Sequence, residues 1–206
     1  MKLIRNTITM HGGKEVYILI PQEINENITA GHDNKGFVVI LGNGSGYSFL
    51  AECFAIASEL QKNEILYLPV RFKGCPEFEK RFSSFAYNLT IIFTNYCSTQ
   101  ISIKNIEKVL QVKVLKNETT TRAANINKEN IERWKTERRL TVKIHKNNLY
   151  IASNRDGFSS LAYGAFKMSK YGDDVEYNDY QPHYHYDWQE NTSTSNGVTL
   201  FYWNNY

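Results

Sequence analysis

The chain has 206 residues, of which 42% are apolar and 22% are charged, proportions typical of a soluble globular protein. Its first residues, MKLIRNTITM, lack the apolar run of a signal peptide, and no window approaches the roughly 18 consecutive apolar residues of a membrane span. Three widely spaced cysteines favour buried thiols over a disulfide or a reactive cysteine. We therefore expect a cytoplasmic protein with no membrane segment.

The first half of the chain predicts strands around one helix. Apolar alternation or short apolar runs predict strands at 3–10, 15–20, 37–41, 65–72 and 88–94. The first two strands flank a Gly-Gly turn and read as a hairpin. Residues 21–35 are polar and predict a loop, and residues 47–60 predict a helix.

The second half replays this scheme with two shorter helices added. Strand patterns lie at 111–115, 140–144, 149–152 and 198–203. Helix patterns lie at 101–110, 127–139 and 158–171. The alternation of strands with few helices indicates the α+β class.

An internal repeat organises these elements. Residues 36–60 match residues 147–171, with Asn43 opposite Asn154 and Gly46 opposite Gly157. In each copy an apolar strand leads through a turn into a helix rich in small residues, and the glycine at the turn predicts a positive φ. Small helix residues would allow close packing: Ala51, Ala55, Ala57, Ala162, Gly164 and Ala165.

The repeat predicts the domain organisation. We expect two pseudo-repeated units, residues 1–97 and 98–206, each a mainly antiparallel sheet with one principal helix. We expect the two units either to share a sheet, to pack as a pseudo-symmetric pair or to form one compact domain.

Charge is divided unevenly along the chain. No lysine or arginine follows Lys170, so the last 36 residues carry six acidic side chains and no basic ones, whereas residues 1–170 carry 24 basic and 15 acidic ones. Carboxylates without basic neighbours attract a cationic partner, and tyrosines can anchor the centre of an interface. The acidic segment, residues 172–190, is therefore the candidate partner-binding region, although an ordinary solvated loop has the same composition. Its candidate binding residues are Asp173, Asp174, Glu176, Tyr177, Asp179, Tyr180 and Asp187.

The sequence His183-Tyr184-His185-Tyr186-Asp187 suggests a metal site. On a strand, His183, His185 and Asp187 share one face, and two imidazoles with a carboxylate suit zinc or iron. The alternative is that these three face solvent or a partner while the tyrosines pack inward. We favour this alternative because the first repeat has no matching ligand set, and we expect no cofactor.

Two other segments suggest anion binding. Residues 42–46 are glycine-rich and precede a helix, but they lack the signatures of phosphate-binding loops, so we expect a structural turn. Residues 128–146 carry seven basic side chains, three acidic ones and Trp134, as a single-stranded nucleic-acid surface would. Since a solvated helix face looks the same, nucleic-acid binding is the alternative function and not the leading one.

The second half resembles the small α+β immunity proteins of bacterial polymorphic-toxin and contact-dependent growth inhibition systems. The resemblance rests on the strand 149–152, Asn154, the stretch Gly157-Phe158-Ser159-Ser160-Leu161-Ala162, the His183/His185/Asp187 strand and the closing strand 198–203. It covers about 55 residues directly, and the first half, which lacks His-x-His-x-Asp, only through the repeat.

The resemblance implies a protein that is not an enzyme and that binds and blocks one cognate toxin. Such toxins are often nucleases with basic clefts, which an acidic, tyrosine-rich surface would complement. The sequence thus predicts an immunity protein whose partner is a basic toxin domain and whose interface includes the acidic segment.

Overall fold

The computed structural model describes residues 1–74, 76–99, 101–112, 114, 116–127, 139–171, 183–186 and 197–203. Its strands are β1 (Lys2–Thr9), β2 (Glu15–Pro21), β3 (Ile28–His32), β4 (Val38–Gly42), β5 (Glu64–Leu68), β6 (Ala86–Tyr87), β7 (Thr90–Asn95), β8 (Lys116–Thr121), β9 (Leu140–His145), β10 (Asn148–Ser153), β11 (His183–Tyr186) and β12 (Val198–Tyr202). Its helices are α1 (Gly44–Ser58), α2 (Pro76–Arg81), α3 (Ile103–Gln111) and α5 (Arg155–Met168). The α+β class is confirmed.

The described strands form two mixed sheets. One has seven strands in the order β8-β1-β2-β5-β7-β10-β9, and the other has five in the order β11-β12-β4-β3-β6. Each sheet joins strands from both halves of the chain, because β10 pairs in parallel with β7 and β12 pairs in parallel with β4. Strand β4, which leads into α1, is antiparallel to β3, and strand β10, which leads into α5, is antiparallel to β9.

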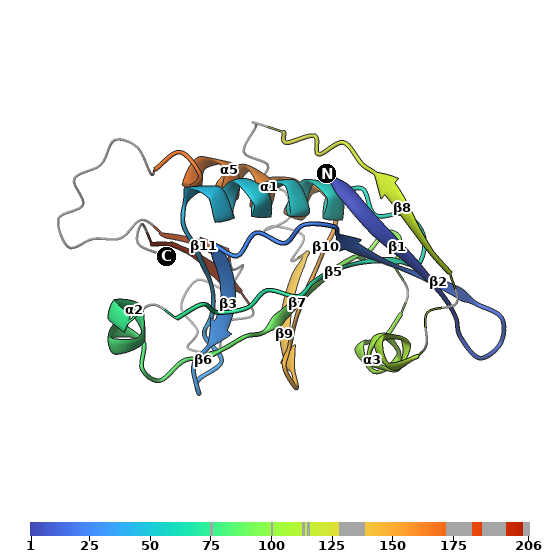
Figure 1. Cartoon of the computed structure of the whole chain (residues 1–206), viewed down its shortest axis with the longest axis horizontal. Helices are drawn as coiled ribbons and strands as arrows, with labels where there is room; N and C mark the ends of the chain where they lie inside the picture. Colours follow the sequence, from blue (N-terminus) through green and yellow to red (C-terminus); the bar gives the residue numbers. More distant parts are fainter. Residues whose placement is uncertain are drawn as a thin grey trace.

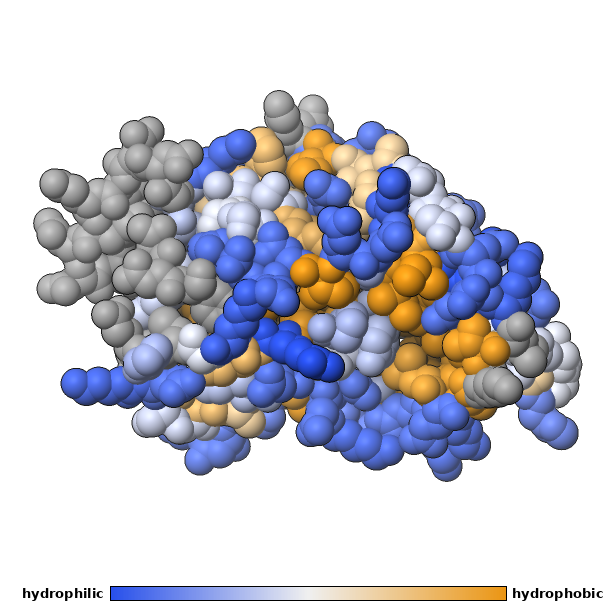
Figure 2. Space-filling model, viewed as in Figure 1, coloured by the Kyte–Doolittle hydropathy of each residue, from blue (hydrophilic) through white to orange (hydrophobic). Residues whose placement is uncertain are grey.

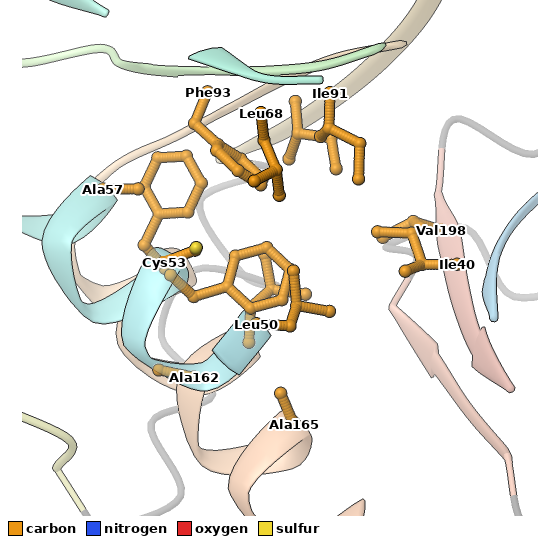
Figure 3. Close-up of a cluster of buried hydrophobic side chains, with 14 of the residues drawn as sticks. Ile40, Leu50, Cys53, Ala57, Leu68, Ile91, Phe93, Ala162, Ala165 and Val198 are labelled. Carbon is orange, nitrogen blue, oxygen red and sulfur yellow. The ribbon is translucent and has the colours of Figure 1, made fainter. Parts of the chain in front are cut away.

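The main core lies between the two long helices and the two sheets. Helices α1 and α5 pack side by side across the top of Figure 1, above the strands. Figure 3 shows the side chains that meet there: Leu50, Cys53 and Ala57 of α1, Ala162 and Ala165 of α5, Leu68, Ile91 and Phe93 of the larger sheet, and Ile40 and Val198 of the smaller one. Burying one leucine or phenylalanine contributes about 1.5–3 kcal/mol, so this shared core fastens the two sheets to each other through the helices.

Both long helices begin three residues earlier than predicted. The side chain of Asn43 accepts a hydrogen bond from the Gly46 amide at 3.1 Å, and Asn154 accepts one from the Gly157 amide at 2.9 Å. Asparagine is a strong N-cap because its side-chain oxygen satisfies an amide that has no partner within the helix. The paired asparagines of the repeat are therefore helix caps.

The glycines of the two turns have a different role from the one predicted. Neither Gly46 nor Gly157 has a positive φ. A Cβ atom on Gly46 would lie 2.0 Å from the carbonyl oxygen of Asn27, and one on Gly157 would lie 1.9 Å from Ser153 Oγ. At Gly46 glycine is required because the backbone of Asn27 approaches too closely for any side chain, whereas at Gly157 a methyl group would have to displace the Ser153 hydroxyl.

Several predicted boundaries were wrong. The polar stretch 21–35 contains β3, which pairs with β4 and β6 although its sequence, ITAGH, has no clear alternation. The strand predicted at 65–72 ends at Leu68, before Pro69. Of the strand predicted at 111–115, Gln111 belongs to α3 and the described residues 112 and 114 are not in a strand; the next strand, β8, begins at Lys116. The helix predicted at 127–139 lies almost wholly outside the described residues.

A second, smaller core lies on the other face of the seven-stranded sheet. Helix α3 begins at the N-cap Ser102 and buries Ile106 and Val109 against the strands. In Figure 1 it lies below the sheet, on the side opposite α1 and α5. None of the described helices has both the length and the apolar character to cross a bilayer.

Candidate protein-binding surface

The predicted interface residues flank strand β11 in the sequence. The residues Asp173, Asp174, Glu176, Tyr177, Asp179, Tyr180 and Asp187 lie outside the described part of the chain. The residues next to them along the chain are described: Tyr171 precedes the acidic segment, and β11 lies within it. The described part of the site therefore consists of β11 and the residues that contact it.

Strand β11 is the edge of the five-stranded sheet and is held from inside by two tyrosines. It pairs with β12. Tyr186 is buried, and its hydroxyl donates a hydrogen bond to the Ser160 carbonyl of α5 at 3.1 Å. The hydroxyl of Tyr184 lies 3.2 Å from that of Tyr171. Tyr171 and Tyr184, which lie on either side of residues 172–182 in the sequence, are thus in contact beside α5.

Burial and hydrogen bonding shift the pKa values of these phenols. Desolvation is the largest cause that raises the pKa of Tyr186 above its ordinary value. The hydrogen bond with Tyr184 is the largest cause that raises the pKa of Tyr171. Both phenols stay neutral at physiological pH, so they serve as packing and hydrogen-bonding groups and not as charged ones.

The histidines of β11 face away from the helices, as the alternation predicted. The rings of His183 and His185 lie 4.8 Å apart at 80°, and His185 Nδ1 lies 2.9 Å from Thr199 Oγ1. The third member of the suggested metal set, Asp187, lies outside the described residues. Within the part of the chain that the structure describes, no three His, Cys, Asp or Glu side chains are grouped to hold a metal ion.

An aromatic cluster continues from these histidines across the outer face of the smaller sheet. His183 stacks on Phe201 with ring centroids 6.0 Å apart, and Phe201 contacts Phe82 at 5.4 Å. Further ring contacts connect the whole outer aromatic cluster: Phe37, Phe72, Phe82, Phe85, Tyr87, Phe201 and Trp203. Of these, Trp203 is buried and the others are partly exposed.

The sheet register explains why this cluster faces outward. Ile40 and Leu200 point to the core beneath α1 and α5, and their neighbours Leu41 and Phe201 point to the opposite face. Aromatic side chains are enriched at protein interfaces and dominate binding energies there. The arrangement can therefore bind a protein surface by apolar and aromatic contact, beside a strand flanked in sequence by carboxylates.

The basic segment 128–146 is described only from residue 139 onward. Lys128, Arg133, Trp134, Lys135 and Arg138 lie outside the described residues. Lys143 and Lys146, at the β9–β10 hairpin, line a hollow with Lys104 and Lys108 of α3. The sequence did not connect these four lysines, because α3 and the hairpin are separated by about 30 residues and meet only in the folded chain, where Glu107 of α3 contacts His145 and Lys146.

Sequence reasoning also missed the outer aromatic cluster. Its members come from strands and connections between residue 37 and residue 203, so no local spacing marks them. The one signal was the high aromatic content, 14% of the chain. No known family model, curated protein or solved structure matches this chain.

Proposed function

We propose that this protein is an immunity protein that binds and neutralises a cognate bacterial toxin by protein–protein contact. The interface comprises the acidic segment and the outer aromatic cluster beside it. The observation that carries the proposal is the continuity of ring contacts from His183 and His185 on β11 into that cluster. An aromatic surface that includes a strand flanked in sequence by carboxylates suits a partner with positive charge around an apolar centre.

The resemblance to immunity proteins supports the proposal from the sequence side. Its Asn154 turn and the start of its helix correspond to the capped N-terminus of α5, and its His-x-His strand corresponds to β11. The proposed partner is a basic toxin domain, in keeping with a nuclease whose cleft binds phosphates. In that cleft the acidic segment competes with the substrate for the same positive charges, so the protein acts by binding and not by catalysis.

We also infer that the two halves of the chain are pseudo-repeated units that exchange strands. In each half a hairpin, β3–β4 or β9–β10, leads through an asparagine cap into a long helix. In each half a later strand, β7 or β12, then pairs in parallel with the hairpin of the other half. This reciprocal arrangement supports a duplication in which neither unit completes a sheet alone.

The proposal is tested by calorimetric titration of this protein with the toxin domain encoded next to its gene. In the test variant Asp173, Asp174 and Asp179 become Asn and Glu176 becomes Gln. A matched control variant removes four negative charges elsewhere, at Glu15, Glu23, Glu52 and Glu59. Because exposed charge contacts contribute about 0.2–1 kcal/mol each, the test variant should bind roughly fourfold or more weakly and the control should bind as the parent does.

Undiminished binding by the test variant would remove the acidic segment from the interface. A toxin domain that does not bind the parent protein at all would reject the immunity function.

Single-stranded nucleic-acid binding through residues 128–146 stays the alternative prediction. It requires affinity for an unstructured oligonucleotide that falls steeply with salt. Absence of binding at low salt would end it.

A further inference from the structure

A basic hollow lies between α3 and the β9–β10 hairpin, away from β11. Its volume is about 650 Å³, within the range of ligand pockets. Four lysines line it, together with His145 and one carboxylate: Lys104, Lys108, Lys143, Lys146 and Glu107. In Figure 2 hydrophilic residues cover the outward side of α3, at the lower right.

The single carboxylate of the hollow, Glu107, is already paired with neighbouring side chains. Glu107 is 9% exposed; it accepts a hydrogen bond from Lys146 Nζ at 2.9 Å and lies 3.2 Å from His145 Nε2. The hydroxyl of Tyr150 lies 3.4 Å from its other oxygen. The hydrogen bond from Lys146 is the main cause that lowers the pKa of Glu107, so this carboxylate is ionised and neutralised by its neighbours.

Three lysines therefore retain unbalanced charge. Lys104, Lys108 and Lys143 are exposed, and none of them has a carboxylate within ion-pair distance among the residues the structure describes. Lys104 and Lys108 are one helical turn apart, so they project from the same side of α3. With His145 neutral, the four lysines and Glu107 leave the hollow with a formal charge of +3.

The uncharged residues of the lining indicate which kind of anionic partner fits, a nucleic acid or an acidic peptide. Ile103 and Ile144 are half-buried aliphatic residues, and no aromatic ring is among the lining residues the structure describes. A nucleic-acid site without sequence preference relies on base stacking against aromatic rings, which this lining does not offer. An aliphatic floor can instead bury an apolar side chain.

We propose that the hollow between α3 and the β9–β10 hairpin binds an acidic peptide segment of another protein, with an apolar side chain of that segment on Ile103 and Ile144. The carboxylates of the peptide contact Lys104, Lys108 and Lys143. This surface differs in sign from the acidic segment, so it serves a partner other than the basic toxin.

Fluorescence anisotropy with a labelled probe tests this assignment on the full chain. The probe is a short peptide of Glu and Asp with one central Leu, compared with the same peptide carrying Gly instead and with an oligothymidylate of equal charge. The hollow variant is Lys104→Gln, Lys108→Gln, Lys143→Gln. A matched control variant, Lys35→Gln, Lys62→Gln, Lys80→Gln, removes the same charge from exposed sites on other elements.

We expect the Leu peptide to bind the parent protein with an affinity that falls as the salt concentration rises. The hollow variant should bind it at least about fivefold more weakly, the control variant should bind as the parent does, and the Gly peptide should bind more weakly than the Leu peptide. Four results would each overturn the assignment: no binding at low salt, equal losses in both variants, equal binding of the two peptides, or tighter binding of the oligothymidylate.

Discussion

The hydroxyl of Tyr186 rests against the backbone of Gly164, where a Cβ atom would approach it to 1.8 Å. Only glycine at this position of α5 leaves room for the phenol that donates to the Ser160 carbonyl. This contact fixes the distance between α5 and β11. The position of β11, the edge strand within the acidic segment, therefore depends on one glycine of α5.

Gly164→Ala should destabilise the protein, because the methyl group overlaps a buried phenol. Overpacking of this kind costs about 1–3 kcal/mol in the free energy of unfolding, measurable by urea denaturation. In a Tyr186→Phe background the same substitution should cost less, since the nearest atom is removed, but some cost should remain because Cζ would lie 2.8 Å from the new methyl. Equal costs in the two backgrounds would show that the Gly164–Tyr186 contact is not the cause.

The asparagine cap of α5 offers a second test. Asn154→Ala should lower the free energy of unfolding by about 1 kcal/mol, since the Gly157 amide loses its acceptor. Asn154→Asp keeps an acceptor oxygen at the same place and should retain most of the stability. Equal destabilisation by both substitutions would mean that capping is not what Asn154 contributes.

Tyr47 of α1 joins two parallel strands through its hydroxyl. The oxygen lies 2.7 Å from the Ile40 carbonyl of β4 and 2.8 Å from the Phe201 carbonyl of β12, and burial raises the pKa of the phenol well above its ordinary value. Tyr47→Phe should cost about 1–3 kcal/mol because it removes a buried donor from these carbonyls. Thermal unfolding measures this cost, and an unchanged melting temperature would contradict it.

Glu107 predicts a specific dependence of stability on pH. Its pKa is lowered in the folded protein, chiefly by the hydrogen bond from Lys146. A depressed carboxylate pKa contributes stability that is present above the unfolded value, about 4.5, and is lost as the pH falls through the folded value. Lys146→Met should raise the Glu107 pKa, as followed by NMR titration of its carboxyl carbon, and should reduce the loss of stability on acidification. An unmoved pKa would mean that Lys146 does not set it.

The sequence predicted the elements with strong local signals. The Asn43 and Asn154 turns and the helices after them follow from the internal match, and Gly164 was among the small helix residues expected to allow close packing. The alternation at β11 was also confirmed, since Tyr184 and Tyr186 pack toward the core and the histidines face away.

The parts that could not be predicted depend on contacts between distant residues. β3 lacks alternation because both of its faces are covered, and three of its residues, Ile28, Thr29 and Ala30, are wholly buried. The pairing of β12 with β4 joins residues more than 150 positions apart, and no spacing rule encodes it. The outer aromatic cluster follows from this pairing and was missed for the same reason. The basic hollow was found only in part, since Lys143 and Lys146 belong to the predicted basic segment but Lys104 and Lys108 reach them only in the folded chain.

Hydrogen–deuterium exchange of the protein alone and in complex with its adjacent toxin domain tests the central claim most directly. The account predicts that toxin binding slows exchange in peptides spanning residues 171–190 and in those carrying Phe82 and Phe85, with little change in α3 and the β9–β10 hairpin. Protection confined to α3 and that hairpin, with residues 171–190 exchanging as in the free protein, would contradict it.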